Sequence, residues 1–456
     1  MNISEESSLN PTMQFTFELY KTIVSSEEEN VLISPLSVTV ALSMTLMGGR
    51  SNTAEQMKKV LIMEDSEETF SKYSEIILHF NKNSDTVKIA NRMYLQKDYS
   101  IESDFTSSLK KIFQSDCGIV DFINDSINAK NSINSWVSSV TENKINDLLG
   151  DVEPSTRLIL ISAIYFKGFW AKKFSTSLTK THPFYVTKDK IVNTDMMYQK
   201  GKFGYLKDEE LQAHVLRLPY EKDALSMIII LPSEIDGLQE IENKLSSDKF
   251  NSLCNEVKSC VGDVHVWLPK FKLESAINLK AVLSKMGITD LFDPSKADLS
   301  GINNKRDLYV DEVIHKAFID VNEEGTEAAA ATAVDDELCS QEYYEIPEFK
   351  ADHPFLYFVV DHKYNNILFI GSLKLPNSAQ SGKVQSGLLA YKRQDSEIKI
   401  ETSGSIVLLP GTEWAETKED LSVASTAESC GPKDFRALLL LLVGSQISIP
   451  DLLQDS

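Results

Sequence analysis

The side chains best suited to catalysis in this 456-residue chain are its histidines, cysteines and serines, and their spacing matches no familiar catalytic or metal-binding motif. No GxSxG, HExxH, P-loop or GxGxxG pattern is present. The seven histidines do not have the spacing of metal ligands: His79, His182, His214, His265, His315, His353 and His362. A Ser-His-Asp triad can assemble from any chain order, but nothing here favours one. We therefore predict that the protein is not an enzyme and needs no metal or cofactor.

The cysteines indicate a reducing compartment. They are five in number and scattered: Cys117, Cys254, Cys260, Cys339 and Cys430. An odd, unclustered set does not form a disulfide framework, and structural thiols are typical of the cytosol. The first residues, MNISEESSLNPTMQF, lack the basic start and apolar core of a signal peptide. We predict a cytoplasmic protein, and leave unconventional secretion open.

Composition and charge narrow the range of partners. The chain is 42% hydrophobic and 25% charged, as in globular proteins, and its net charge is -21. Such an acidic chain is a poor ligand for nucleic acid. The apolar run at 437–443 is too short to cross a bilayer. We expect a monomer that binds neither nucleic acid nor membrane.

One segment stands out by composition, namely residues 323–344, EEGTEAAAATAVDDELCSQEYY. Four consecutive alanines follow an acidic Gly-Thr step. Alanine and glutamate favour helices, so an exposed helix or a solvated linker would explain the segment if it were read in isolation. The sequence around the segment must therefore show whether it is one of these or has a function of its own.

Those elements predict an α+β architecture. Ser34-Pro35, followed by an apolar stretch and Gly48-Gly49, predicts a buried helix capped by Ser34. Residues 133–148 predict an amphipathic helix, and the apolar run 158–166 predicts a strand covered on both faces. Residues 261–274 alternate with period two, and 353–361 with 366–375 predict a hairpin. Helices come first and mixed elements follow, which is typical of α+β folds.

After Pro376 the composition changes. Residues 377–387, NSAQSGKVQSG, are a polar linker. Residues 388–456 show no domain-scale periodicity. We predict a main domain over 1–376 and a C-terminal extension over 377–456, made of a linker and a poorly ordered tail.

Nine stretches, taken together, resemble the serpin family from about residue 12 to 376, and the absence of a signal peptide points to its intracellular, ovalbumin-like branch. Their order and spacing match throughout: 31–57, 91–105, 133–149, 158–170, 216–232, 268–274, 286–302, 314–332 and 351–376. Among them are NRMYLQKDYSIESDF, LILISAIYFKGFW and IHKAFIDVNEEGTEAAAAT. The resemblance implies about nine helices around three β-sheets, with an exposed reactive-centre loop at about 323–349.

The resemblance also implies a function for the alanine-rich segment. In inhibitory serpins a target protease cleaves the loop, the cut loop inserts into the large sheet, and the acyl-enzyme is trapped covalently. The chain would then be an endopeptidase inhibitor that acts as a suicide substrate. The alternative is a non-inhibitory serpin that serves as a chaperone, carrier or storage protein. Such members carry charged or bulky residues in the hinge, unlike this sequence.

The hinge residues suit insertion. The resemblance assigns this role to Glu323, Glu324, Gly325, Thr326, Glu327, Ala328, Ala329, Ala330, Ala331 and Thr332. If Thr326 faces the interior, alternation brings Ala328, Ala330, Thr332 and Val334 inward as well, all uncharged and most of them small. Asp336 would also face inward, which departs from this pattern and would slow the last step unless that position stays wet.

The cleaved bond is placed by counting. Seventeen residues from Glu323 give Cys339-Ser340 as the first choice, with Leu338-Cys339 second, whereas counting back from Pro354 gives a bond near Tyr343. Small or medium apolar residues before the bond would suit a chymotrypsin-like or elastase-like serine protease, or a papain-like cysteine protease.

The resemblance carries further roles to residues outside the loop. Ser34, Ser37 and His315 would belong to the shutter, a buried polar cluster beneath the large sheet. Ser162 stands where the family usually has Asn, and its shorter reach predicts a looser or water-bridged network. Trp170 would lie at the breach, where the loop first inserts, and Lys270 would pair with Glu323 at the top of the sheet as a surface ion pair.

Overall fold

The computed structural model describes residues 11–63, 67–83, 86–325 and 345–376, together with three strands further on. The chain divides into two compact units, Met1–Ala379 and Gln380–Ser456. In the second unit β15 (Leu388–Gln394), β16 (Glu397–Thr402) and β17 (Trp414–Lys418) form a sheet in the order β16-β15-β17. The poorly ordered extension that we expect after residue 376 stays a prediction.

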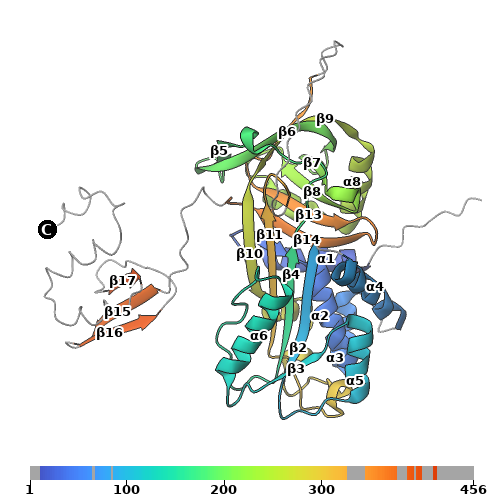
Figure 1. The fold of residues 1–456 in the computed structure, drawn as a ribbon, viewed down its shortest axis with the longest axis vertical. Coiled ribbons are helices and arrows are strands. Elements are labelled where there is room, and N and C mark those ends of the chain that lie inside the picture. The colour runs from blue at the N-terminus through green and yellow to red at the C-terminus, as the bar shows by residue number, and fades with distance from the viewer. Residues whose placement is uncertain are drawn as a thin grey trace, which may run out of the picture. The chain divides into compact units, whose positions relative to one another are not determined.

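The first unit combines ten α-helices with two sheets in its described residues, which confirms the α+β class (Figure 1). The helices are α1 (Pro11–Val24), α2 (Pro35–Gly48), α3 (Ser51–Leu61), α4 (Glu67–Asn83), α5 (Ser103–Ser108), α6 (Ser126–Val140), α7 (Leu238–Lys244), α8 (Ser247–Ser259), α9 (Lys280–Met286) and α10 (Ser300–Asn303). Short turns of other helix types are η1 (Leu109–Phe113), η2 (Thr176–Leu178), η3 (Glu221–Asp223) and η4 (Asp290–Phe292).

The five-stranded sheet holds the elements nearest to the hinge. Its order is β10 (Phe271–Asn278), β11 (Glu312–Val321), β4 (Leu158–Phe166), β2 (Val87–Gln96) and β3 (Cys117–Val120). β11 and β4 are parallel neighbours, whereas β10 with β11 and β2 with β4 are antiparallel.

The other sheet has nine strands. Its path runs β1 (Val31–Ile33), β14 (Asn366–Leu373), β13 (Phe355–Asp361), β8 (Leu225–Pro232), β7 (Ala213–Pro219), β6 (Ile191–Asp208), β9 (Val261–Pro269) and β12 (Glu348–Lys350), with β5 (Lys180–Tyr185) also on β6. The resemblance implied three sheets. Here the 18-residue β6 pairs with β9 from Met196 to Gly204 and with β7 from Gly204 to Asp208, so hydrogen bonds join two of the three expected sheets into one path.

Strand β4 is buried on both faces, as its uninterrupted apolar sequence predicts. Leu158, Leu160, Ile164 and Phe166 belong to the main core beside α2. Ile159, Ile161, Ala163 and Tyr165 pack in a second core with α6. α6 and α2 therefore cover opposite faces of the sheet (Figure 1). Each face of β4 touches a different helix, so no position in the strand is free to carry an exposed side chain.

Helix α2 begins and ends as expected. Ser34 Oγ accepts a hydrogen bond from the backbone N–H of Ser37, Pro35 occupies the first helical position, and Gly49 is the C-cap residue. All but one of its residues are buried, which confirms that the apolar circumference marks a core helix. The hairpin of β13 and β14 is also confirmed.

Two predicted elements are corrected. The helix expected at 133–148 spans Ser126–Val140 instead, because Glu142 and Asn143 have positive φ angles of 54° and 61° that end the helix. The strand expected at 261–274 is two strands, β9 and β10, which pair in different sheets. Met196 pairs with Pro269 and Val321 pairs with Phe271, so the chain changes sheets at Lys270.

No helix in the described part of the chain is long and apolar enough to span a bilayer. The three described cysteines, Cys117, Cys254 and Cys260, are free thiols. Burial raises the pKa of Cys117 and of Cys254 to about 12, so both remain protonated near neutral pH. Structural thiols are therefore the interpretation that fits these two residues.

Candidate functional site: the hinge and the polar network beneath the sheet

The acidic start of the alanine-rich segment continues directly from β11. Of the predicted hinge, Glu323, Glu324 and Gly325 lie within the described residues. Thr326, Glu327, Ala328, Ala329, Ala330, Ala331 and Thr332 lie outside them, as do Leu338, Cys339 and Ser340. The roles of those residues therefore stay predictions.

Gly325 closes a tight turn at the end of β11. Its backbone N–H donates to the carbonyl of Asn322 (3.1 Å), and its own carbonyl accepts from the N–H of Asn322 (2.9 Å). Its φ angle is 124°, in a region that favours glycine. A Cβ at this position would also collide with the carbonyl oxygen of Gly168. Only glycine fits the turn, which fixes where the following chain leaves the sheet.

Trp170 holds this turn from beside the sheet. Its indole Nε1–H donates to the carbonyl of Asn322 (2.9 Å), and its backbone N–H donates to the carbonyl of Glu324 (2.9 Å). The ring stacks on Tyr220 at 4.5 Å and is only 2% exposed. The structure thus brings Trp170 to the base of the alanine-rich segment, where the resemblance assigned it the breach.

Glu323 forms a compact polar cluster at the same place. Its carboxylate lies 3.0 Å from Lys270 Nζ and accepts a hydrogen bond from Thr179 Oγ1 at 2.8 Å. Burial opposes its ionisation, but hydrogen bonds from its own backbone N–H, from Lys270 and from Thr179 together lower its pKa. Glu323 is 6% exposed, so the predicted surface pair is in fact half-buried.

Four side chains form a continuous polar network below the sheet. Ser37 Oγ lies 2.9 Å from both Asn91 Oδ1 and Ser162 Oγ, and Ser162 Oγ lies 3.0 Å from His315 Nδ1. The backbone N–H of Ser34 donates to His315 Nε2 (3.0 Å). The network links α2, β2, β4 and β11, and Ser34, Ser37, Ser162 and His315 are fully buried.

The donors and acceptors of this network have one consistent arrangement. Because Nε2 of His315 accepts from Ser34, its Nδ1 must carry the proton and donate to Ser162 Oγ. Ser37 donates to Asn91 Oδ1, so Ser162 must donate to Ser37. The Nδ2 of Asn91 completes the chain by donating to the carbonyl of Ser37. Each hydroxyl therefore accepts one bond and donates one.

Asn91 was missed by sequence reasoning, and it explains why Ser162 suffices. β2 pairs with β4 so that Asn91 lies directly opposite Ser162. Asn91 supplies the amide, and Ser162 needs only to relay a hydrogen bond to His315. The looser, water-bridged network that we expected is not observed, since the contacts of Ser162 are direct. The available signal was a polar residue among the otherwise apolar alternate positions of this strand, Val87, Ile89, Met93 and Leu95.

The network crosses the pair of strands that a loop would have to separate. His315 on β11 lies opposite Ser162 on β4, in the middle of an eight-residue parallel register. Parting β11 from β4 would break the bond between these two side chains and leave the Nδ1–H of His315 without its acceptor in the interior, at a cost of about 1–3 kcal/mol. The network can therefore resist opening of the sheet.

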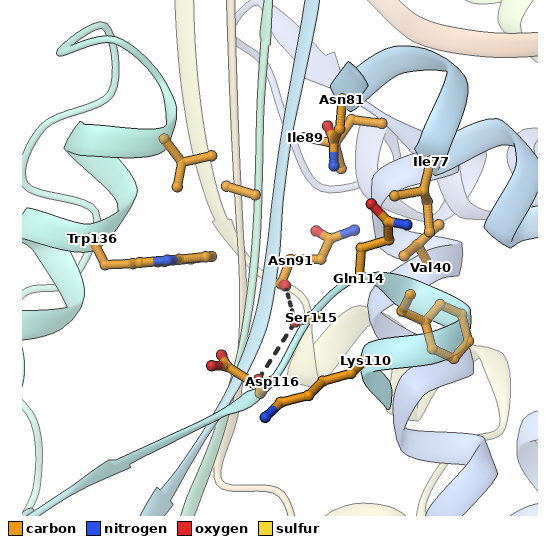
Figure 2. Close-up of a pocket in the computed structure, with 13 residues that line it drawn as sticks. Val40, Ile77, Asn81, Ile89, Asn91, Lys110, Gln114, Ser115, Asp116 and Trp136 are labelled. Atoms are coloured by element: carbon orange, nitrogen blue, oxygen red, sulfur yellow. Dashed lines mark hydrogen bonds between the residues drawn. The ribbon is translucent and has the colours of Figure 1, made fainter. Parts of the chain in front are cut away.

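The Asn91 end of the network borders a cavity of about 510 Å³ (Figure 2). β3 pairs with only the last four residues of β2, so the carbonyl of Asn91 accepts instead from Ser115 Oγ at 2.7 Å. Lys110, Gln114 and Trp136 complete part of the lining. This end of the network lies at an open sheet edge, whereas the His315 end lies deep in the core.

Burial gives His315 a strong pH dependence. It lowers the pKa of this histidine to about 4. In the unfolded chain this histidine has a pKa near 6.5, so between pH 6.5 and 4 the unfolded chain binds a proton that the folded chain does not. The contribution of His315 to the free energy of unfolding is therefore fully present above pH 6.5 and is lost as pH falls toward 4. At 1.36 kcal/mol per pH unit, the loss attributable to His315 is about 2 kcal/mol by pH 5. Protonation would also remove the acceptor for Ser34.

The expected result is a flatter pH profile of unfolding free energy in His315→Gln than in the parent, measured by denaturant titration from pH 7.5 to 5. At pH 7 the variant is less stable than the parent, but its unfolding free energy falls less than that of the parent between pH 7.5 and 5. His182→Gln, which alters a half-buried histidine of β5 outside the network, serves as control and keeps the parental slope. Parallel profiles for the parent and His315→Gln would contradict the assignment.

Within the described ranges no group of three His, Cys, Asp or Glu side chains could hold a metal ion. The site consists of a pair of parallel strands, a fixed turn at the end of one of them and the buried polar network beneath them.

Known proteins resemble the chain over this whole region. A family model described as "Serpin (serine protease inhibitor)" matches residues 10–376. The leukocyte elastase inhibitor of Xenopus tropicalis is 42% identical over 372 residues, covering 79% of this chain and 97% of that protein. The human leukocyte elastase inhibitor is 41% identical over 357 residues, covering 76% and 93%.

Among solved structures, uncleaved ovalbumin superimposes with a TM-score of 0.72 at 29% identity, covering 80% of this chain and 99% of ovalbumin. In this chain β11 and β4 are direct neighbours in the five-stranded sheet.

Proposed function

Since the chain belongs to the serpin family, in its ovalbumin-like branch, we propose that it inhibits serine endopeptidases by inserting its cleaved loop between β4 and β11. The observation that carries the proposal is the parallel pairing of those two strands, with β11 leading straight into the loop. A segment that folds back from the end of β11 runs antiparallel to both neighbours. Insertion would therefore replace one parallel contact by two antiparallel ones, which are slightly more stable per residue.

The fixed turn at Gly325 and the polar network support this proposal. Gly325 fixes the turn at the end of β11, and the bond of Ser162 to His315 joins β4 to β11 and would oppose their separation before cleavage. The uncharged, mostly small residues that would face inward, from Thr326 to Val334, would not oppose burial. The departure at Asp336 would lower efficiency at the last step.

The target we propose is an elastase-like or chymotrypsin-like serine protease. The relatives are named leukocyte elastase inhibitors, and Cys339 or Leu338 before the cleaved bond would suit such an enzyme. A papain-like cysteine protease is the second candidate, because a thiol enzyme also forms an acyl intermediate. The cytoplasmic location and the monomeric state stay predictions.

The test is incubation with a panel of elastase-like, chymotrypsin-like and papain-like proteases, followed by a denaturing gel and mass spectrometry. We expect a detergent-stable complex with at least one serine protease and cleavage after Cys339 or Leu338. A chain that is cut stoichiometrically but never forms a stable complex would instead support a non-inhibitory chaperone, carrier or storage protein.

A further inference from the structure

Three paired strands, the last of which follows the predicted loop in sequence, carry an aromatic cluster that the insertion mechanism does not use. β6, β9 and β12 pair so that Tyr198 lies opposite Trp267, and Lys350 pairs with Trp267 on its other side. In the next row Lys200, His265 and Glu348 are aligned in the same way, and Lys202 lies opposite Asp263. We call these eight residues the aromatic face: Tyr198, Lys200, Lys202, Asp263, His265, Trp267, Glu348 and Lys350.

The centre of the aromatic face is ordered by ring contacts. Tyr198 lies 4.9 Å from Trp267 and stacks on His265 at 6.0 Å, and its hydroxyl lies 2.8 Å from His265 Nδ1. Lys350 Nζ lies 5.3 Å from the Trp267 ring centroid. These contacts hold the three rings in place before any partner arrives, which reduces the entropy lost on binding.

These rings do not belong to the buried core of the sheet. The alternate residues on the same strands fill the core, including Val266, Leu268 and Phe349, which are 0% exposed. Tyr198, His265 and Trp267 are half-buried, whereas the five charged residues around them are exposed. A half-buried aromatic centre with a charged rim has the composition of a protein-binding surface.

The aromatic face adjoins the predicted reactive-centre loop along the chain. The backbone N–H of His265 donates to the carbonyl of Pro347 (2.9 Å), which fixes the residue just before β12. From Ser340 to Pro347 a fully extended chain spans at most roughly 25 Å. A globular domain of about 200 residues has a radius of gyration of roughly 16 Å. A protease that engages the Cys339-Ser340 bond is therefore held close enough to reach this face.

The charge of the rim differs from that of the whole chain. Three of its five charged residues are lysines, Lys200, Lys202 and Lys350, in a protein with 46 basic and 67 acidic residues. The rim therefore suits carboxylates on a partner, although the net charge of the whole chain is -21.

We propose that the aromatic face is a second docking surface for the target serine protease, outside that enzyme's active-site cleft. It would bind an apolar side chain beside Trp267 and Tyr198, with flanking carboxylates paired to Lys200 and Lys350. This proposal rests on the proposed function. It adds that association with the protease depends on this surface, whereas insertion of the cleaved loop does not.

The test compares two double charge reversals in the full chain. Lys200→Glu/Lys350→Glu changes the aromatic face. Lys59→Glu/Lys305→Glu makes the same change in net charge at exposed lysines on α3 and after α10. All four positions are exposed, so both variants should fold, which is checked by an unchanged melting temperature. The measured quantities are the association rate constant with the protease inhibited by the parent, and the stoichiometry of inhibition.

We expect the aromatic-face variant to associate at least tenfold more slowly at low salt and the control less than twofold. The stoichiometry should remain parental for both, and the tenfold difference should shrink in high salt. If the parent formed a normal complex but the two variants had equal association rate constants, the docking role of the aromatic face would be wrong and the proposed function would stand. Failure of the parent itself to form any complex would overturn the proposed function and this inference with it.

Discussion

Thr326→Arg is expected to convert the protein from an inhibitor into a substrate of the same protease. Thr326 follows the fixed turn at Gly325 and lies outside the described residues. If it is the first side chain to turn inward, its arginine replacement must pass between strand ends that are fully buried, at Phe166 and Ile319. A buried charge without a partner costs several kcal/mol.

That cost raises the barrier to insertion and therefore slows it. Insertion competes with hydrolysis of the acyl-enzyme, and each ~1.4 kcal/mol on the insertion barrier slows it tenfold. A penalty of about 4 kcal/mol would slow insertion roughly a thousandfold. The expected result on a denaturing gel is loss of the stable complex, with the cleaved variant accumulating and active protease recovered.

Glu327→Arg is the matched control. It places the same charge one residue further along, where alternation directs it outward. It should therefore retain most of the stable complex, and Thr326→Val should retain it too. If Thr326→Arg gave full complex yield, loop insertion as proposed would be wrong. If Glu327→Arg failed equally, the register with Thr326 inward would be wrong.

Local patterns in the sequence predicted the elements that are buried on all sides. The run at 158–166 is strand β4 as predicted, and the capped helix after Ser34 is α2. In both, every position is in contact with the core, so hydrophobicity and capping residues determine the element without information from distant parts of the chain.

The misplaced elements depended on information that periodicity does not contain. Ile145 and Leu148 are buried next to α6 although they follow its last residue, so they extended the apolar pattern beyond the helix. Likewise the alternation from β9 to β10 continues through Lys270, while the chain passes from one sheet to the other. The periodic spacing of apolar residues indicates that a face is buried, but it does not indicate which element buries that face.

In the candidate site too, some residues were predicted from the sequence and others depend on how the strands pair. Ser34, Ser37, Ser162 and His315 were predicted to meet, and the structure brings them together. Asn91 was not predicted, because only the register of β2 with β4 places it opposite Ser162. The aromatic face depends similarly on pairing among β6, β9 and β12. Such clusters are assembled by long-range register, which a single sequence does not specify.

Cleavage of the loop is expected to raise the melting temperature by tens of degrees. In the uncleaved protein β4 and β11 share a single parallel ladder of eight residue pairs. Insertion would replace that ladder with two antiparallel ladders, and about ten additional backbone hydrogen bonds at ~1 kcal/mol each would contribute on the order of 10 kcal/mol. The inserted strand would also take up the hydrogen-bonding groups that the two parted strands would otherwise leave unpaired.

The measurement is thermal unfolding before and after a single cut between residues 326 and 344, verified by mass spectrometry. Cut Thr326→Arg is the control, because a loop that cannot enter the sheet gains no ladder, and its melting temperature should change by only a few degrees. An unchanged melting temperature in the cut parent would show that β4 and β11 do not accept the loop. The parallel pair would then be a permanent feature of the sheet, and the trapping mechanism would lose the free energy that drives it.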